Sequence, residues 1–197
     1  MYEYRKLTPT ERAELVRQRL ARGFPPHSPP HPVRDQPYCL LTAACYEHVS
    51  CMASPGRRQQ LLDSLFEAFI TGGIELRAWV ILPNHYHLLA HIADFRALSQ
   101  LFRRVHGPLA RQWNLEDSTP GRKVWCSFTD RAIRSQRHYC TTLNYIHYNP
   151  VKHHWAASPY EWPQSSVHWY LEHYGQEWLR DLWIRYPIRE YGRGWDD

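Results

Sequence analysis

The 197-residue sequence has no apolar run that approaches the roughly 18–20 residues needed to span a bilayer, so no membrane-spanning helix is expected. No apolar segment follows the first residues, Met1–Lys6, which argues against a secretory signal. The five cysteines are odd in number and lack zinc-finger spacing. This usage is typical of reduced core thiols, and the expected location is the cytoplasm.

Lysine is also scarce. Of the 24 cationic side chains, 3 are lysine and 21 are arginine, and 19 carboxylates leave a formal net charge of +5. The planar arginine fork grips phosphate and stacks on bases, so the bias favours a nucleic-acid partner. A GC-rich coding sequence would produce the same bias, and composition alone does not separate these two interpretations.

Hydrophobic residues make up 43% of the chain, enough to bury a sizeable core. Before that core, residues 8–23 predict a helix with a cap at Thr8, a capping-box partner at Glu11 and a stop at Gly23. Six prolines then fall within residues 24–37, which excludes a helix there. We expect residues 1–37 to form a helical arm and a proline-rich connector.

The remaining pattern predicts alternating strands and helices. Strands are expected at 38–46, 74–82, 85–92 and 123–134, and helices at 55–71, 95–113 and 136–149. In the second strand, alternation places Glu75 and Arg77 on one face and Leu76, Ala78, Val80 and Leu82 on the other. The last helix should stop at Asn149, because proline disfavours helical geometry in the residue before it.

This order is the split βαβ arrangement of an α+β, ferredoxin-like fold. It predicts a four-stranded antiparallel sheet with two helices on one face, and it leaves the other face for a site. Residues 38–155 would form this domain. Residues 156–197, which include Trp162, Trp169, Trp178, Trp183 and Trp195, would form a helical extension packed on it.

The first candidate site is His85-Tyr86-His87. Residues i and i+2 of a strand share a face, so two imidazoles could bind one ion. With 13 histidines in the chain, about 0.9 His-x-His pairs are expected by chance, so the pair alone proves nothing. Its place after the Pro83-Asn84 turn, on the less apolar face of a strand, gives it more weight.

The second candidate is the helix that contains Tyr145 and Asn149. These residues are four apart and share one face, so a phenol and an amide could be presented together. The local pattern by itself favours a packing role for Tyr145 and a helix cap at Asn149.

Two motifs together resemble a known family. The segment 79–89, WVILPNHYHLL, and the segment 145–152, YIHYNPVK, closely resemble the REP-associated tyrosine transposases, which belong with the single-tyrosine HUH transposases of bacterial insertion sequences. Residues 125–134 and 162–166 are also similar to family segments, and the resemblance covers about residues 38–170. The segment 153–156, HHWA, departs from the glycine or alanine and aliphatic residues common there.

The resemblance implies a metal-dependent DNA strand transferase. The HUH histidines map onto His85 and His87, the nucleophile onto Tyr145 and not Tyr148, and a polar third metal ligand onto Asn149. The catalytic tyrosine helix would then cover the free sheet face. The family implies Mg²⁺, although the ligand types alone suit Mn²⁺ or Zn²⁺ as well.

The implied partner is single-stranded DNA with a hairpin or imperfect palindrome, bound by a monomer or homodimer. The residues expected to contact DNA are Arg103, Arg104, Arg122, Lys123, Arg131, Arg134, Arg137 and Lys152. His91, His138 and His147 are expected to support the site or the fold. A non-catalytic DNA-binding protein and an RNA-binding module of the same strand order are the alternatives.

Overall fold

The structure, a computed structural model, describes residues 8–21, 37–95 and 97–193. The chain divides into two compact units, Met1–Arg34 and Asp35–Asp197. In the first unit, α2 (Pro9–Ala21) begins with the expected capping box. The Glu11 carboxylate accepts from the Thr8 amide at 2.7 Å, and Thr8 Oγ1 accepts from the Glu11 amide at 3.3 Å. The predicted stop at Gly23 and most of the proline-rich connector lie outside the described residues.

The second unit contains the predicted four-stranded antiparallel sheet, with the order β2-β3-β1-β4. This order confirms the ferredoxin-like α+β fold. The strands are β1 (Tyr38–Ala44), β2 (Glu75–Ile81), β3 (His85–His91) and β4 (Thr129–Ala132). The helices are α3 (Pro55–Thr71), α4 (Leu98–Glu116), α5 (Gln136–Lys152) and α6 (Val167–Arg185), with 3-10 turns at Tyr46–His48 and Pro159–Glu161.

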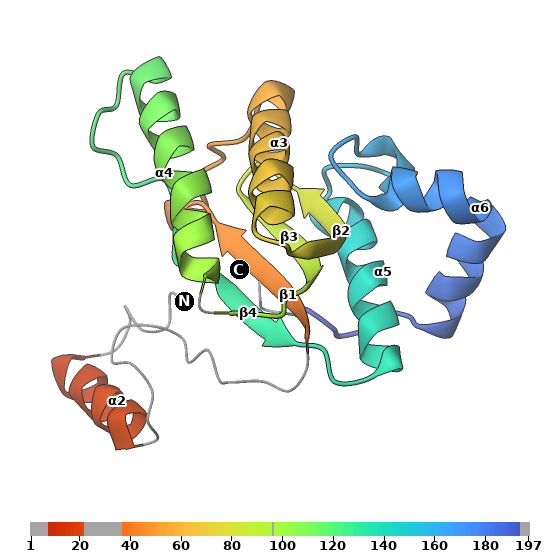
Figure 1. Cartoon of the computed structure of the whole chain (residues 1–197), viewed down its shortest axis with the longest axis horizontal. Coiled ribbons are helices and arrows are strands. Elements are labelled where there is room, and N and C mark those ends of the chain that lie inside the picture. Colours follow the sequence, from red (N-terminus) through yellow and green to blue (C-terminus); the bar gives the residue numbers. More distant parts are fainter. Residues whose placement is uncertain (1–7, 22–36, 96, 194–197) are drawn as a thin grey trace. The chain divides into compact units, whose positions relative to one another are not determined.

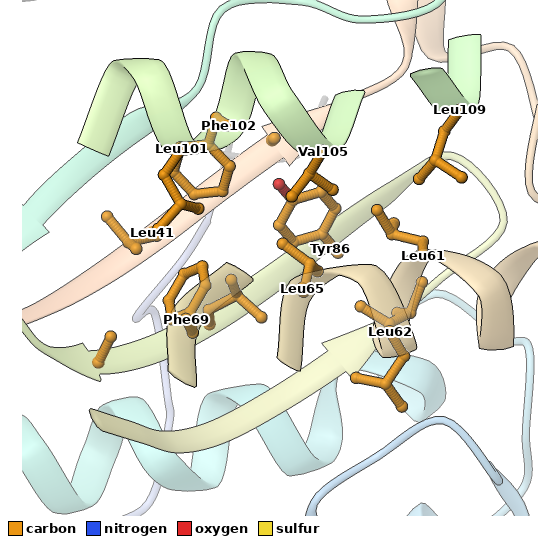
Figure 2. Close-up of a cluster of buried hydrophobic side chains, with 14 of the residues drawn as sticks. Leu41, Leu61, Leu62, Leu65, Phe69, Tyr86, Leu101, Phe102, Val105 and Leu109 are labelled. Carbon is orange, nitrogen blue, oxygen red and sulfur yellow. The ribbon is translucent and has the colours of Figure 1, made fainter. Parts of the chain in front are cut away.

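Helices cover both faces of the sheet (Figure 1). Alternate residues of β3, namely Tyr86, Leu88 and Ala90, belong to the core beneath α3 and α4, which we call the α3/α4 face. Figure 2 shows this core, with the Tyr86 ring between the two helices. On the opposite α5/α6 face, Leu89 packs with Leu143 and other residues of α5 and α6. The predicted alternation in β3 is therefore confirmed.

The alternation predicted for β2 is wrong at one point. Leu76 pairs with Ala90 and Ala78 with Leu89, so Arg77 is an extra residue that bulges the strand. A bulge moves the residues before it to the other face. Leu76 consequently packs with the α3/α4 core, whereas Ala78 lies in the core of the α5/α6 face.

Two predicted boundaries also need correction. The strand expected at 123–134 is reduced to β4, because Trp125 makes only an isolated bridge to Cys45 and then stacks on His106 with ring centroids 4.1 Å apart. Helix α5 does not stop at Asn149 but runs through Pro150 to Lys152. Proline removes one amide donor, but the next turn closes through the His153 amide and the Asn149 carbonyl at 3.1 Å.

The segment after α5 packs on the α5/α6 face. The Trp162 indole is buried and donates to the Ile81 carbonyl at 2.8 Å, while the Tyr170 hydroxyl donates to the Arg77 carbonyl at 2.9 Å. Trp195 lies outside the described residues. Among the described helices, none combines the length and the apolar character needed to cross a membrane. All cysteines are free thiols, and four of the five are buried.

Candidate metal and tyrosine site

The His85 ring is held between two side-chain amides. His85 begins β3 directly after the Pro83-Asn84 turn, and its side chain is almost fully buried. Its Nδ1 lies 2.8 Å from Asn84 Oδ1, and its Nε2 lies 3.1 Å from Asn149 Oδ1. The adjacent turn therefore orients the ring toward α5.

The His87 ring is oriented in a similar way. Its Nδ1 lies 2.7 Å from the hydroxyl of Thr42, the residue paired with it across β1 and β3. Its Nε2 lies 3.3 Å from the Tyr145 hydroxyl. The two imidazole centroids are 5.1 Å apart, so the strand presents both rings to one small volume.

Helix α5 supplies the other two candidate residues. Tyr145 and Asn149 are one turn apart, and both are fully buried against the sheet. The structure thus brings together His85, His87, Tyr145 and Asn149, which we call the four-residue cluster. Local sequence reasoning found these residues but left their meeting open, because the two motifs are about sixty residues apart.

The buried amide of Asn149 fits a cation ligand. Asn84 Nδ2 contacts the His48 carbonyl at 3.4 Å, so its Oδ1 faces His85 Nδ1 and places the neutral ring's proton there. The Nε2 lone pair of His85 then faces an acceptor, Asn149 Oδ1, while Asn149 Nδ2 is buried without a hydrogen-bond partner. If the Asn149 amide is rotated by 180°, Nδ2 donates to His85, but Oδ1 is then the buried atom without a hydrogen-bond partner.

A divalent cation would resolve that mismatch. Ligands at right angles on an ion with bonds of about 2.1 Å are about 3.0 Å apart, close to the observed contact. Two imidazoles and an amide oxygen suit Mn²⁺ or Zn²⁺ by ligand type. The residues present therefore fit a divalent ion, and the orienting partners Asn84 and Thr42 match the usual support of metal-binding histidines.

Tyr145 is surrounded by Lys152, which belongs to the same motif, and by Tyr191 and Gly192, which no motif indicated. Lys152 Nζ lies 5.1 Å from the Tyr145 ring centroid and donates to the Gly192 carbonyl at 3.0 Å. Gly192 has a φ of 79°, and a Cβ placed on it would overlap the Tyr145 ring. The Tyr191 ring packs edge-on against Tyr145 with centroids 5.5 Å apart. No sequence motif marks this contact, because it joins a helix to a distant irregular segment.

The histidine after α5 is a second unanticipated neighbour. The His153 ring lies 4.9 Å from the His85 ring, within the segment that departs from the family pattern. Two other histidines on α5 have structural partners. His138 Nε2 lies 3.0 Å from the Tyr191 hydroxyl, and His147 Nε2 lies 3.0 Å from Ser166 Oγ. Burial lowers the pKa of His147 to about 3, so it is neutral near pH 7.

The predicted DNA contacts do not gather in one place. Near the start of α5, three side chains are exposed: Arg131, Arg134 and Arg137. Arg103 and Arg104 are exposed on α4, on the opposite face of the sheet from the four-residue cluster. Arg122 pairs with Asp117 at 2.7 Å, and Lys123 Nζ lies 4.5 Å from the Tyr46 ring centroid. Only Lys152 among these residues approaches the cluster.

Comparison with known proteins identifies the family, although no family model matches the chain. A REP-associated tyrosine transposase of Escherichia coli is 30% identical over 125 residues, which cover 57% of this chain and 70% of that protein. The chain belongs to the family of REP-associated tyrosine transposases. A relative of this transposase family from Haemophilus influenzae is 32% identical over 108 residues, or 48% of this chain and 59% of that protein.

A solved structure shares the fold. It is a REP-associated tyrosine transposase bound to a REP hairpin, and it aligns with a TM-score of 0.60 and 23% identity. The alignment covers 74% of this chain and 86% of that one. At 23% identity this similarity shows a common fold. The assignment to the transposase family rests on the Escherichia coli relative.

Proposed function

We propose that this protein nicks single-stranded DNA at hairpin or palindromic repeats and transfers the strand through a covalent 5′-phosphotyrosine. The observation that carries the proposal is the convergence of His85, His87, Asn149 and Tyr145 in one buried cluster. The family membership supports a transposase reaction, and the REP hairpin bound to the related structure supports a hairpin substrate.

The two histidines and Asn149 would hold Mg²⁺ or Mn²⁺, which supplies Lewis-acid polarisation of the scissile phosphate when bound. The protein's own contribution is orientation. Asn84 and Thr42 fix the imidazole rings through Nδ1, so both Nε2 atoms face α5. The phosphate could then be positioned against a nucleophile carried on that helix.

Tyr145 would be the nucleophile. A tyrosine phenol in water has a pKa of about 10, so forming the phenolate near neutral pH needs nearby positive charge. Lys152 Nζ, 5.1 Å from the ring centroid, adds such charge. As the bond from the tyrosine oxygen to phosphorus forms, the bond to the 3′ oxygen breaks, and that oxygen takes up a proton. The phosphotyrosine conserves the bond energy for rejoining.

The proposal requires one movement. Tyr145 is fully buried, and Gly192 lies directly against its ring. Because Tyr145 has no exposed surface, a phosphate could reach its phenol oxygen only after neighbouring groups, Gly192 among them, move away.

A labelled hairpin oligonucleotide tests the reaction directly. We expect a denaturant-stable adduct with the protein in Mn²⁺ or Mg²⁺ and its loss in excess chelator. Tyr145→Phe should abolish the adduct while retaining DNA binding. Tyr148→Phe is the matched control, because Tyr148 lies three residues away on the exposed side of α5. An adduct that depends on Tyr148 would show that the nucleophile is misassigned.

The second candidate is a non-catalytic DNA-binding protein. The burial of Tyr145 beneath Gly192 favours it, because this arrangement cannot engage a phosphate without rearrangement. This alternative would be established if the protein bound hairpin DNA but formed no adduct in Mn²⁺ or in Mg²⁺. The result should hold for a hairpin with a single-stranded flank and for the same hairpin without it.

A further inference from the structure

A cavity of about 690 Å³ lies on the α5/α6 face, separate from the four-residue cluster. Its walls come from the edge strand β2, the first half of α5, and α6, and it opens to solvent on one side. The volume is typical of ligand sites, which occupy about 300–1,000 Å³. Seven of its sixteen lining residues are aromatic: Trp79, Tyr139, Trp169, Tyr170, Tyr174, Trp178 and Tyr186.

Three of these rings form a stack along α6. The planes of Tyr170 and Tyr174 are within 24° of parallel, as are those of Tyr174 and Trp178, with centroids 5.7 and 4.6 Å apart. Tyr174 remains 52% exposed and Trp178 37% exposed. Parts of these two rings are therefore accessible to a ligand at the cavity, and covering them would be favourable because large aromatic surfaces gain free energy on burial.

The bulge in β2 gives the cavity a polar group without a full set of partners. Arg77 is the bulged residue and lines the cavity, and its Nη2 pairs with Glu75 at 2.6 Å. Its Nε is buried and has no hydrogen-bond partner. The same side chain also hydrogen-bonds Tyr38 and is 38% exposed, so Nε needs one further acceptor, which a water or the edge of a ligand can supply. Asp181 and Arg185 add charged groups from α6.

We infer that this cavity binds an unpaired nucleobase of the DNA strand, an assignment that rests on the proposed function. Every base has a flat π-face that stacks on aromatic rings. Arginine donors and carboxylate acceptors complement the edges of bases, and Arg77 and Asp181 supply one of each. The ligand is therefore amphipathic, planar and able to accept a hydrogen bond.

The cavity lies close enough to the four-residue cluster for one continuous DNA strand to reach both. Helix α5 lines the cavity through Tyr139 and Leu143 and carries Tyr145 farther along. Tyr139 and Tyr145 are six residues apart, which corresponds to about 9 Å along a helix axis. A nucleotide near the scissile phosphate could therefore reach the cavity while the phosphate lies at the cluster.

A proline-rich segment is the main competing occupant, since polyproline helices bind grooves lined with aromatic residues. Residues 24–37 of this chain have that composition. The charged groups favour a base instead, because a polyproline helix offers carbonyl acceptors for Arg77 but no proline N–H donor for the Asp181 carboxylate, whereas a base edge offers both.

The test measures equilibrium binding in a Tyr145→Phe background, which removes strand cleavage. Two end-labelled DNAs are compared: a hairpin with a single-stranded flank and the same hairpin without it. Trp178→Ala and Tyr174→Ala should each weaken binding of the flanked hairpin about 5- to 150-fold, the range for loss of one stacked base. Binding of the unflanked hairpin should remain unchanged.

The matched control is Trp155→Ala, because Trp155 is 47% exposed and does not line the cavity. Trp178→Phe should retain most of the affinity, and thermal melting of each variant verifies folding. Photocrosslinking of a halogenated base in the flank should label the peptide that contains Tyr174 and Trp178.

Three outcomes would overturn the assignment. The first is unchanged flanked-hairpin binding by both alanine variants. The second is an equal loss on both DNAs, which would indicate contact with the duplex. The third is Trp178-dependent binding of a synthetic peptide of residues 24–37 without any change in DNA affinity. Adduct formation is measured separately, with the native chain that retains Tyr145. Absence of an adduct would contradict the proposed reaction without contradicting the binding of a base in the cavity.

Discussion

Successive residues of β3 serve the two faces of the sheet in different ways. Tyr86 enters the α3/α4 face, where it lies in an apolar core and pairs with the buried His106 at 2.8 Å. His85 and His87 enter the α5/α6 face, where their partners are Thr42 and the polar groups of α5. The α3/α4 face is filled by one apolar core, whereas the α5/α6 face combines an apolar core with buried polar side chains, among which Asn149 Nδ2 has no hydrogen-bond partner.

The comparison predicts that the largest effect on the reaction comes from the α5/α6 face. His87→Ala should lower adduct formation by about 100-fold or more, because it removes a proposed metal ligand and not merely an orienting partner. His91→Ala is the matched control, since His91 lies on the same face of β3 but contacts Tyr38. Rates of adduct formation on a labelled hairpin measure both. Equal losses of adduct formation in the two variants would show that His87 has no role beyond that of another histidine on the same face of β3.

On the α3/α4 face the expected loss is in stability. Leu65 is fully buried beneath α4, and Leu65→Ala should lower the free energy of unfolding by about 2–5 kcal/mol. Adduct formation per folded molecule should not change. Ile70→Ala is the control, because Ile70 is 78% exposed on the same helix. Urea unfolding gives the stability, and a selective loss of reaction in folded Leu65→Ala would contradict the division between the faces.

A smaller effect is expected from a residue that only orients a ligand. Thr42→Val removes the hydroxyl 2.7 Å from His87 Nδ1 while keeping the side-chain volume. Loss of such a partner typically weakens metal affinity about 10- to 100-fold. Titration of Mn²⁺ into the variant, followed by calorimetry, measures the change. Unaltered Mn²⁺ affinity would mean that the hydroxyl does not position the ring.

The smallest effect concerns pH. Burial lowers the pKa of His106 to about 3, below its ordinary value of 6.5, so the unfolded chain binds a proton that the folded chain does not. The stability from this residue is complete above pH 6.5 and is lost as the pH falls toward 3. The expected loss between pH 6.5 and 5.5 is about 1 kcal/mol. Urea midpoints of the native chain and His106→Gln test this, since the variant should lose that part of the slope.

Prediction from sequence succeeded where periodicity is local. The alternation of β3 and the helical spacing in α3 and α4 follow from which residues avoid water, so strand order and layers could be anticipated. The bulge at Arg77 and the passage of α5 through Pro150 could not, because tertiary contacts decide them. At both places the tertiary contacts outweigh the local preference, which is regular alternation in β2 and a helix end before proline in α5.

The candidate site shows the same division. His85, His87, Tyr145 and Asn149 were identified by motif, and their spacing on one strand and one helix fixes which pairs share a face. The orienting roles of Asn84 and Thr42 and the cover supplied by Gly192 depend on segments that meet only after folding. Residue type alone gives no signal for such meetings.

The register of β3 limits which insertions this gene product can tolerate. β3 is a central strand paired on both sides, with Ala44 opposite His85 and Thr42 opposite His87. Slipping it by one residue would send Tyr86 to the side that holds the four-residue cluster and both histidines into the apolar core of the α3/α4 face. The edge strand β2, in contrast, already accommodates an extra residue at Arg77. Length variation among descendants of this chain should therefore accumulate along the edge that borders the aromatic cavity, and should be purged from the strand that carries the histidines.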